Sequence, residues 1–543
     1  MCTSRLWMSV SREVACARGC ATRVASRATR LLCMALMRLA HLDGLRFFLA
    51  LWVVVFHTSG SGGGWPLGKG NPPYENRGEL LWKLNRLVST WLEQAAVRSG
   101  VVVFVILSGF TMHWVHGSER MRFRFVEIAD FYVKRFDRVL LSTWVTMGVS
   151  MLIPMLLFGK WPDLAKAFGC SFFLYEWVMP LVTPDSSNYS WSCPNFPAWA
   201  IGAAFLPSWV LYPLVTRPLL QRLGACGLLV SACAMFGLSF GFDLVAAFGM
   251  MNQTAVAADE WPDKHDRHRT EMMYVFPPFW LPPFAFGAAC AGLVRLRYPA
   301  GDASALRCAG GADRLQPANE ATPLVASPYE EAMANASATE SSAVQWPPSR
   351  ATAWRWVCMA TADLSAIGFI LLISIMPTRS GKLQSERHQI LLMHSIMPFV
   401  GLHFIAASAG PHPGLFGSLF RHAIPVSLSK YSFEAYLWHI PLLQILTCWG
   451  STMHCYSDSH PPATENMATY VAFLVLVWVV AGTYAEYVQN PLTARTRRAF
   501  RAWKDRQVDD GKDFASAAEC ALAAGRPCGR LAQRMCAGML DQL

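Results

Sequence analysis

The sequence predicts an all-α polytopic membrane protein, a helical bundle of about ten transmembrane helices. Of the 543 residues, 53% are hydrophobic and only 15% are charged, whereas a soluble domain carries roughly 25% charged residues. Apolar runs of about 20 residues, the length that crosses a bilayer as a helix, recur along the chain. Because backbone groups inside lipid must be satisfied within the segment, these runs exclude a soluble multi-domain enzyme and favour membrane-embedded helices.

The expected spans follow one another from the first long apolar run to the last. Several are short or are interrupted by proline, which breaks a helical pattern. The ten segments start near Leu45, Val97, Val139, Ala198, Leu219, Tyr274, Trp356, Gln389, Ile424 and Ala468.

The distribution of positive charge predicts the orientation of these spans. The formal net charge is +11, and most lysines and arginines fall in the segments that ten spans would leave on the same side as the two termini. Cytosolic segments carry such an excess, so both termini are expected in the cytosol of a multi-pass protein in an endomembrane or the plasma membrane. The charges are dispersed between apolar runs, which argues against a nucleic-acid partner.

Composition divides the chain into five parts. Residues 1–40 are basic and rich in Ser and Thr, which is typical of a targeting segment or of an N-terminus held inside by its charge. Residues 41–295 form the first membrane half and carry most of the motifs below. Residues 296–353 are rich in Ala, Ser, Pro and Gly and predict a disordered cytosolic loop. Residues 354–492 form the second membrane half, and 493–543 a basic cytosolic tail.

Cysteines and glycosylation sequons add little to this organisation. The sixteen cysteines include no paired C-x-x-C spacing, so the sequence predicts neither a zinc ribbon nor a disulfide framework. The sequons at Asn188 and Asn252 fall on the expected outer side, and the one at Asn335 falls inside.

The first span contains an ionisable pair, Arg46 at its cytosolic end and His57 eleven residues later. A rise of 1.5 Å per residue separates them by roughly 16 Å along a helix, which puts the histidine within the membrane's depth. An ionisable group there is costly and is a candidate functional residue. The alternative is an interface histidine that is hydrogen-bonded to a backbone carbonyl.

Two further elements follow in the next spans. The run from Gly100 to Phe110 contains Ser108 followed by a glycine, a small pair that suits close helix packing. At the entrance of the third span, Arg135 and Arg138 are three residues apart and share a helical face. Two guanidinium groups on one face suit a diphosphate, although positive-inside anchoring is the alternative.

A fourth element, from Ser429 to Pro441, brings Glu434, Tyr436 and His439 into a late span. Aromatic-rich membrane helices usually serve as anchors at the interface, so this run by itself does not distinguish a site from an anchor.

Together the four elements resemble the acyltransferase-3 family of integral-membrane O-acyltransferases, which acetylate sugars and surface polysaccharides. The matches keep the family's order between residues 41 and 492. They are the opening L-D-G-L-R with a basic-x10-His spacing, the V-x-x-F-x-x-L-S-G-F run, an R-x-x-R, a Y-S-x-x-x-Y-L-W-H-x-P, and a closing segment at 484–491.

The resemblance implies acetyl-CoA or another acyl-CoA as donor, arriving from the cytosol, and no metal. It also implies a hydroxyl-bearing acceptor, such as a sugar, a glycan or a lipid, in contact with the membrane. We expect His57 to deprotonate that hydroxyl, because the ordinary pKa of an imidazole, about 6.5, lies near working pH. Arg135 and Arg138 would hold the coenzyme phosphates, Arg46 would lie near the same mouth, and Ser108 or Tyr436 would polarise the carbonyl.

The chain departs from the family pattern at two positions. Ala204 stands where the family carries a glutamate, and the closing E-x-P begins with Gln489. These departures keep open a transporter, or a lipid or small-molecule translocator, on the same scaffold. A membrane acyltransferase of another family would need a His/Asn pair of its own.

Other polar groups are weaker candidates. Asp363, His394 and His403 lie in apolar runs, where hydrogen bonding inside the bundle is the simpler interpretation. The other weak candidates lie in expected loops: a possible metal pair, His265 and His268, and an H-x3-D spacing at His454 and Asp458.

Overall fold

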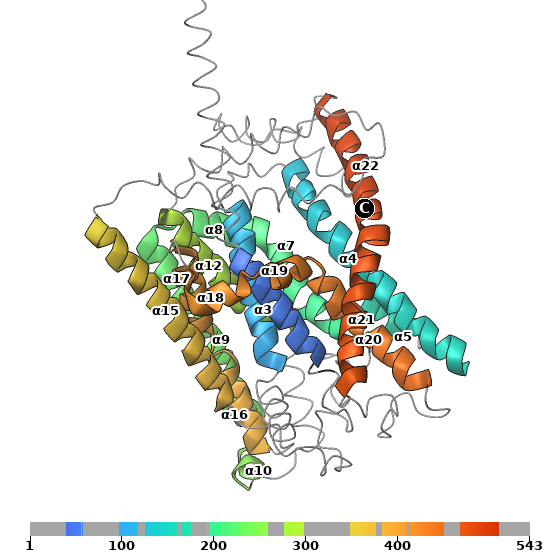
Figure 1. Ribbon diagram of the computed structural model, residues 1–543, viewed down its shortest axis with the longest axis horizontal. Helices are drawn as coiled ribbons and strands as arrows, with labels where there is room; N and C mark the ends of the chain where they lie inside the picture. Colours follow the sequence, from blue (N-terminus) through green and yellow to red (C-terminus); the bar gives the residue numbers. More distant parts are fainter. Residues whose placement is uncertain are drawn as a thin grey trace, which may run out of the picture.

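The computed structural model of the chain describes thirteen stretches of it. They comprise residues 40–55, 57, 97–117, 125–159, 164–174, 177, 193, 195–258, 276–297, 348–375, 383–409, 413–449 and 467–509. All regular secondary structure within these stretches is helical (Figure 1), which confirms the predicted all-α class.

The first helix is described over residues 40–55 and 57. The other elements follow it in chain order. They are α3 (Val97–His116), α4 (Phe125–Phe158), α5 (Leu164–Ser171), η1 (Phe196–Ala198), η2 (Ile201–Phe205), α7 (Leu206–Leu211), η3 (Tyr212–Thr216), α8 (Arg217–Gln221), α9 (Ala225–Leu244), η4 (Val245–Met250), α10 (Gln253–Ala257), η5 (Pro277–Trp280), α12 (Leu281–Arg297), α15 (Pro348–Ser374), α16 (Leu383–Met393), α17 (Met397–Ala409), α18 (Gly414–Phe420), α19 (Ala423–Ser429), α20 (Ser432–Trp449), α21 (Met467–Tyr484), η8 (Ala485–Gln489) and α22 (Asn490–Asp509).

Within the described residues, seven helical segments are long and apolar enough to cross a membrane, so the chain is an integral membrane protein. They are Ser99–His116, Glu127–Ile153, Ala225–Met250, Pro277–Leu296, Thr352–Ser374, Arg387–Ala409 and Val471–Trp503. The other three expected spans, near Leu45, Ala198 and Ile424, coincide with helices that are shorter or interrupted. The count of ten stays a prediction.

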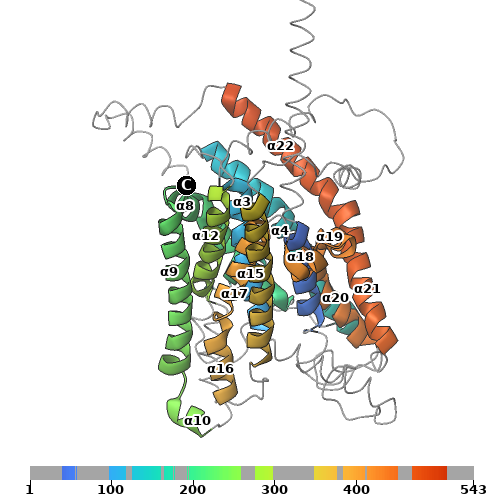
Figure 2. The same cartoon turned by 60° about the vertical axis from the view of Figure 1, so that its left-hand side comes forward.

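The first helix lies at the centre of the bundle (Figures 1 and 2). One of its faces packs on α3, where the Trp52 ring covers Gly100. Its opposite face, with Ala50 and Val54, packs on α20 and α21. Near its start the backbone approaches α18 so closely that a Cβ at Gly44 would stand 1.7 Å from the carbonyl oxygen of Phe420. The glycine of the opening L-D-G-L-R is therefore required by packing.

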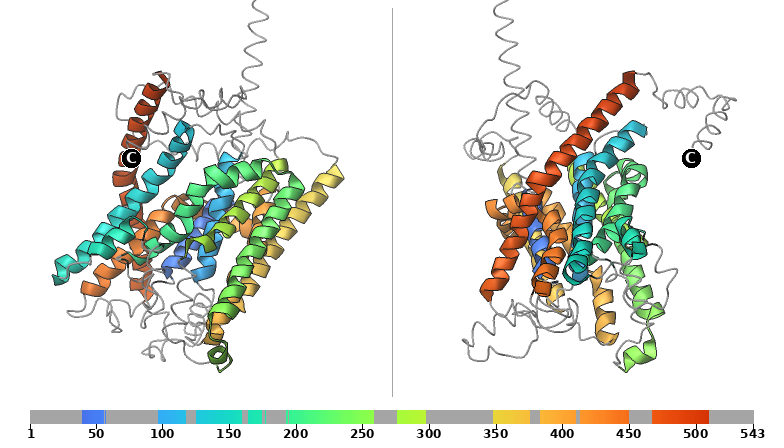
Figure 3. Two further views of the ribbon diagram at one scale, coloured as in Figure 1. Left: turned by 180° about the vertical axis from the view of Figure 1, so that it is seen from behind. Right: turned by 90° about the vertical axis from the view of Figure 1, so that its right-hand side faces the viewer.

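The two ends of the bundle differ in chemistry. One end carries the start of α4 and the basic helix α22, with Arg495, Arg498 and Arg501. The opposite end carries α5 and α10 (Figures 1 and 3). We call these the basic end and the opposite end.

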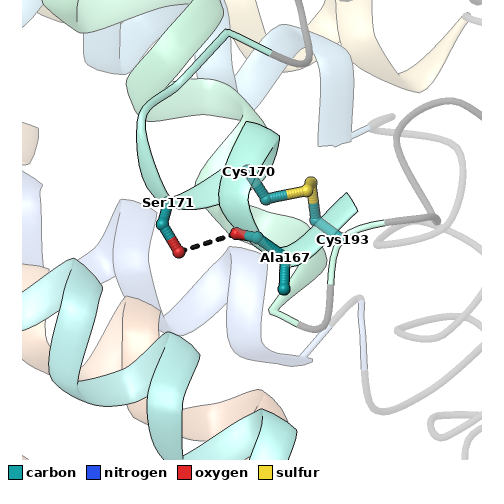
Figure 4. Close-up of a disulfide and its surroundings, with 4 residues drawn as sticks. All are labelled: Ala167, Cys170, Ser171 and Cys193. Carbon is teal, nitrogen blue, oxygen red and sulfur yellow. Dashed lines mark hydrogen bonds between the residues drawn. A yellow bond between two sulfur atoms is a disulfide. The ribbon is translucent and has the colours of Figure 1, made fainter. Parts of the chain in front are cut away.

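A disulfide between Cys170 and Cys193 lies at the opposite end (Figure 4). The sequence predicted no disulfide framework, and this single bond is one that the cysteine spacing did not indicate. Cys170 ends up beside Cys193 because α5 folds back on the end of α4, where both sulfurs join a buried cluster with Met147 and Ala198. A separation of 23 residues has no signature in the sequence, so only the tertiary approach creates the bond.

The small residues of α3 serve helix packing, as predicted. A Cβ at Gly109 would stand 2.0 Å from the carbonyl oxygen of Phe284 on α12, and one at Gly287 of α12 would stand 2.0 Å from the carbonyl oxygen of Ile106. The two glycines therefore let α3 and α12 cross with their backbones in contact.

Gly109→Ala should destabilise the protein by about 1–3 kcal/mol, the usual effect of overpacking, because the obstructing atoms belong to the α12 backbone. Gly148→Ala in α4 is the matched control, because nothing lies within 4 Å of the added methyl group, and alanine favours a helix by about 0.8–1.0 kcal/mol over glycine. Thermal unfolding in detergent should lower Tm for the first variant only. Equal shifts for the two variants would contradict the close crossing.

Candidate active site

Two imidazoles from distant parts of the chain meet where the described part of the first helix ends against α20. Nδ1 of His57, on the first helix, lies 2.9 Å from Nε2 of His439, on α20. Their rings stack with centroids 5.0 Å apart and planes 6° apart. His439 is fully buried, and His57 is partly buried. The predicted candidate His57 is therefore paired with another imidazole.

A proline within α20 shapes the turn that carries His439. Pro441 has no N–H, so it cannot bond the carbonyl of Leu437 four residues earlier. The Asn195 side chain supplies the missing donor, with its Nδ2 3.1 Å from that carbonyl oxygen. Asn195 is fully buried, so α20 depends at this point on the segment that precedes η1.

Tyr436 lies beside the imidazole pair. Its ring centroid is 6.0 Å from that of His439, and its hydroxyl donates to the carbonyl oxygen of Pro197 at 2.7 Å. The structure thus brings together three of the polar residues of the first and fourth sequence elements.

Ser108 lies elsewhere. Its oxygen accepts a hydrogen bond from the Trp209 indole at 3.0 Å. The first helix and α3 run antiparallel, and Trp52 of the first helix lies level with Gly100 of α3. Ser108, eight residues after Gly100, is about 12 Å from this level toward the basic end. His57, five residues after Trp52, is about 7.5 Å from it toward the opposite end. The register separates this serine from the imidazole pair.

The three predicted arginines gather at the basic end. The charge of Arg135 is within electrostatic range of Arg46, Arg138 and the Tyr212 hydroxyl. Arg46 forms an ion pair with Asp43 one helical turn earlier. We call Arg46, Arg135 and Arg138 the guanidinium group.

Arg138 also has a structural partner. Its Nε and one terminal nitrogen each lie 3.4 Å from Oε1 of Glu434, and that terminal nitrogen donates to the carbonyl oxygen of Lys430 at 2.8 Å. The Glu434 side chain is fully buried, and that of Arg138 is half-exposed. Arg138 therefore compensates a buried carboxylate of α20 and still presents charge to solvent.

The first helix and α20 connect the two groups of residues. Arg46 and His57 are eleven residues apart on the first helix, which is roughly 16 Å of rise, and Glu434, the partner of Arg138, is five residues from His439 on α20, roughly 7.5 Å. The site is therefore elongated along the bundle axis, with the arginines at the basic end and the imidazoles toward the opposite end. Such a layout suits a ligand with an anionic head and a long arm.

The positions that depart from the family pattern have structural roles. Ala204 is fully buried in the apolar core within the π-helical turn η2, and its carbonyl accepts from Ser208 at 2.8 Å. Gln489 donates from Nε2 to the backbone carbonyl of Arg138 at 3.0 Å, which ties η8 to α4. A glutamate would lack that donor.

The other polar candidates have partners inside the bundle. Asp363 caps the start of α18 by accepting from two backbone N–H groups, and His403 lies 3.0 Å from the carbonyl oxygen of Ala362. His394 pairs with Asp243 at 2.8 Å. This confirms bundle-interior hydrogen bonding for all three predicted residues.

Two expected loop candidates cannot be placed. The histidines at 265 and 268 and the H-x3-D spacing at 454–458 lie outside the described residues, as do residues 1–39 and 298–347. Among the residues that the structure does describe, no three His, Cys, Asp or Glu side chains cluster as a metal site.

Sequence reasoning singled out His57 but missed its partner and Asn195. His439 is 382 residues away, and its motif alone is also typical of an interface anchor. Pro441 is the one signal that points to Asn195, because a proline inside a span leaves a carbonyl that needs a donor from elsewhere.

Fold and site together define a polytopic helical membrane protein with a pair of contacting imidazoles and a group of arginines at its basic end. A family model described as an acyltransferase domain, Acyl_transf_3, matches residues 39–486. The chain therefore belongs to the acyltransferase-3 family, as its motifs predicted, and this membership supports membrane acyltransferase activity. No curated protein and no solved structure matches the chain significantly.

Proposed function

We propose that the protein is a membrane-embedded O-acyltransferase that moves an acyl group, an acetyl group in the first instance, from acyl-CoA to a hydroxyl of a carbohydrate, lipid or other small acceptor. The observation that carries the proposal is the His57–His439 pair. His57 shares the first helix with Arg46, and His439 shares α20 with Glu434, the partner of Arg138 on α4. Family membership makes acyl transfer the reaction class.

We propose one tautomer for the pair. Nδ1 of His439 makes no hydrogen bond within the described residues, while its Nε2 faces Nδ1 of His57, and we place the His439 proton on Nδ1. Nε2 of His439 then accepts from Nδ1–H of His57. This assignment leaves the lone pair of His57 on Nε2, which is the atom we propose as the general base.

The reaction then balances without another reagent. His57 Nε2 takes the proton of the acceptor hydroxyl as its oxygen attacks the thioester carbonyl. The C–S bond breaks, the ester forms, and the proton passes from His57 to the leaving thiolate, which gives free CoA thiol. His439 holds the His57 ring and stabilises its transient positive charge by accepting from Nδ1–H. An acyl-histidine intermediate on His57 would give the same products.

The guanidinium group is the proposed holder of the coenzyme phosphates. Guanidinium groups bind phosphate oxygens with paired, charge-assisted hydrogen bonds. Arg135 is the best placed of the three, because Arg46 and Arg138 already pair with Asp43 and Glu434. Repulsion among the three positive charges of the guanidinium group favours an anion bound between them.

Tyr436 and Ser108 were the two residues expected to donate a hydrogen bond to the thioester carbonyl oxygen. Tyr436 is the better placed, because its ring lies next to that of His439. Its hydroxyl would exchange the Pro197 carbonyl for the developing oxyanion. Because Ser108 lies on α3 toward the basic end, we propose that it borders the path by which acyl-CoA enters.

Two independent features support an orientation with cytosolic termini. Basic residues crowd the end that carries α22, as in cytosolic segments. The opposite end carries the Cys170–Cys193 bond, and disulfides persist in oxidising compartments. The donor would therefore enter from the cytosol and the acceptor from the outer side.

Membranes from cells that express the chain test this proposal, with His57→Gln membranes in parallel. Both are incubated with labelled acetyl-CoA, and glycan, lipid and small-molecule fractions are counted. We expect label in one fraction of the wild-type sample only. Binding of the coenzyme without transfer in either sample would contradict the enzyme and favour a translocator.

A further inference from the structure

We propose that the Cys170–Cys193 disulfide and Asn195 form a bracket that positions the His439 turn of α20 for catalysis. The proposal rests on the proposed function for its catalytic consequence, but the bracket itself can be tested without activity. Asn195 and the two cysteines are positioning residues, because they act through α20 and the imidazole pair.

The first link of the bracket is the Asn195 amide. Pro441 leaves the Leu437 carbonyl without its helical donor, and Nδ2 of Asn195 replaces that donor at 3.1 Å. An unsatisfied carbonyl at membrane depth is strongly unfavourable. Leu437 precedes His439 by two residues, so this bond helps to set where the imidazole points.

The second link is the hydroxyl of Tyr436, which donates to the carbonyl of Pro197 at 2.7 Å. Before the reaction begins, Asn195 and Pro197 therefore hold two consecutive residues of α20, Leu437 and Tyr436, through one short segment, and the Asn195 bond to Leu437 persists when the Tyr436 hydroxyl turns to the oxyanion. The carbonyl of Asn195 also accepts from the N–H of Ala198, which closes the turn η1. The segment 195–198 acts on α20 as a unit.

The disulfide anchors this segment. Cys193 precedes Asn195 by two residues, and its bond to Cys170 ties it to the end of α5 (Figure 4). Cys170 and Cys193 are both buried, 1% and 4% exposed. A covalent link so close to Asn195 limits how far the segment can move away from α20.

The end of α5 is itself rigid. The N–H of Leu174 bonds the carbonyl of Gly169, and the N–H of Phe173 bonds that of Cys170, which is the Schellman arrangement of a helix C-terminus. Phe173 occupies the left-handed position with φ of 57°, where glycine is usual, and its buried side chain holds it there.

The α5 end is also joined to α4. The Trp144 indole of α4 donates to the carbonyl of Ser171 at 2.7 Å. The chain of contacts therefore runs from α4 through α5, the disulfide and Asn195 to the turn of α20 that carries His439.

The decisive test is a double-mutant cycle with Asn195→Leu and Pro441→Ala. Asn195→Leu should lower kcat by about 10- to 100-fold, since a misplacement of 1 Å can cost 10²-fold, and should leave KM for acyl-CoA unchanged. Pro441→Ala restores a backbone N–H at position 441 that can donate to the Leu437 carbonyl. In that background the loss of kcat caused by Asn195→Leu should therefore shrink to less than about threefold. An equal loss in both backgrounds would overturn the link.

The disulfide is tested by Cys193→Ser and, if that variant does not fold, by a membrane-impermeant phosphine reductant on folded wild-type protein. Cys226→Ser is the control, because Cys226 is an exposed free thiol on α9. We expect hydrogen exchange of amides 436–440 to quicken by at least about tenfold only when the bond is lost. Unchanged exchange would refute the bracket even if no activity is found. Faster exchange in a protein that transfers no acyl group would refute the proposed function alone.

Discussion

Replacement of His57 by glutamine lowers the rate of acyl transfer by about 10²- to 10⁴-fold, the range that general acid–base catalysis contributes, and leaves the folded protein in the membrane. Glutamine keeps a polar side chain in contact with Nε2 of His439, which lies 2.9 Å from His57, but it cannot accept and return a proton near neutral pH. The measurement is the initial rate of ester formation at saturating acyl-CoA, normalised to the amount of folded protein.

Two further variants make this result specific. His439→Gln should lower the rate of acyl transfer less than His57→Gln does, because in the proposed mechanism His439 orients the base and does not itself take the proton. His403→Gln is the matched control, since His403 is a buried histidine that contacts a backbone carbonyl, that of Ala362. The assignment of His57 as the base fails if His57→Gln retains the native rate of acyl transfer. It also fails if His403→Gln lowers that rate as much as His57→Gln does.

Replacement of Arg135 by glutamine raises KM for acyl-CoA by about 10- to 100-fold with little change in kcat. A hydrogen bond to a charged group contributes about 1.5–3 kcal/mol, and Arg135 lies next to two other arginines in the group proposed to hold the phosphates. The measurement is the dependence of the rate on acyl-CoA concentration, and the wild-type KM should also rise with salt.

Arg138 needs a different variant, because removing it alone leaves the buried Glu434 carboxylate without its partner, a loss of about 3–5 kcal/mol. The double variant Arg138→Gln with Glu434→Gln removes both charges together. Arg501→Gln, on the exposed part of α22, is the control for net charge. Unchanged KM in the Arg135 variant and in the double variant would refute the coenzyme site.

The fold class was predictable from the sequence because the bilayer dictates it. A run of about 20 apolar residues has one common solution in lipid, a helix, so the seven long apolar helices follow from composition alone. The short and interrupted segments, such as 196–221 with its π-helical turns η2 and η3, were harder to predict. Their stability depends on partners such as Ser108, which binds Trp209.

The candidate site was predictable only within single helices. Arg46 and His57 belong to one helix, so their separation follows from helical rise. The contact between His57 and His439 joins residues 382 positions apart, and no local pattern encodes it. The same holds for the Cys170–Cys193 bond and for Asn195, whose position depends on how α5 and η1 pack against α4 and α20.

Release of CoA thiol by the purified protein is the measurement that best tests acyl transfer at His57. We expect that wild-type protein in lipid, given acetyl-CoA and a productive acceptor, frees one thiol for each ester formed, and that His57→Gln reduces both products in parallel. Saturable binding of acetyl-CoA with no acceptor-dependent thiol release would contradict it. In that case the imidazole pair would belong to a carrier.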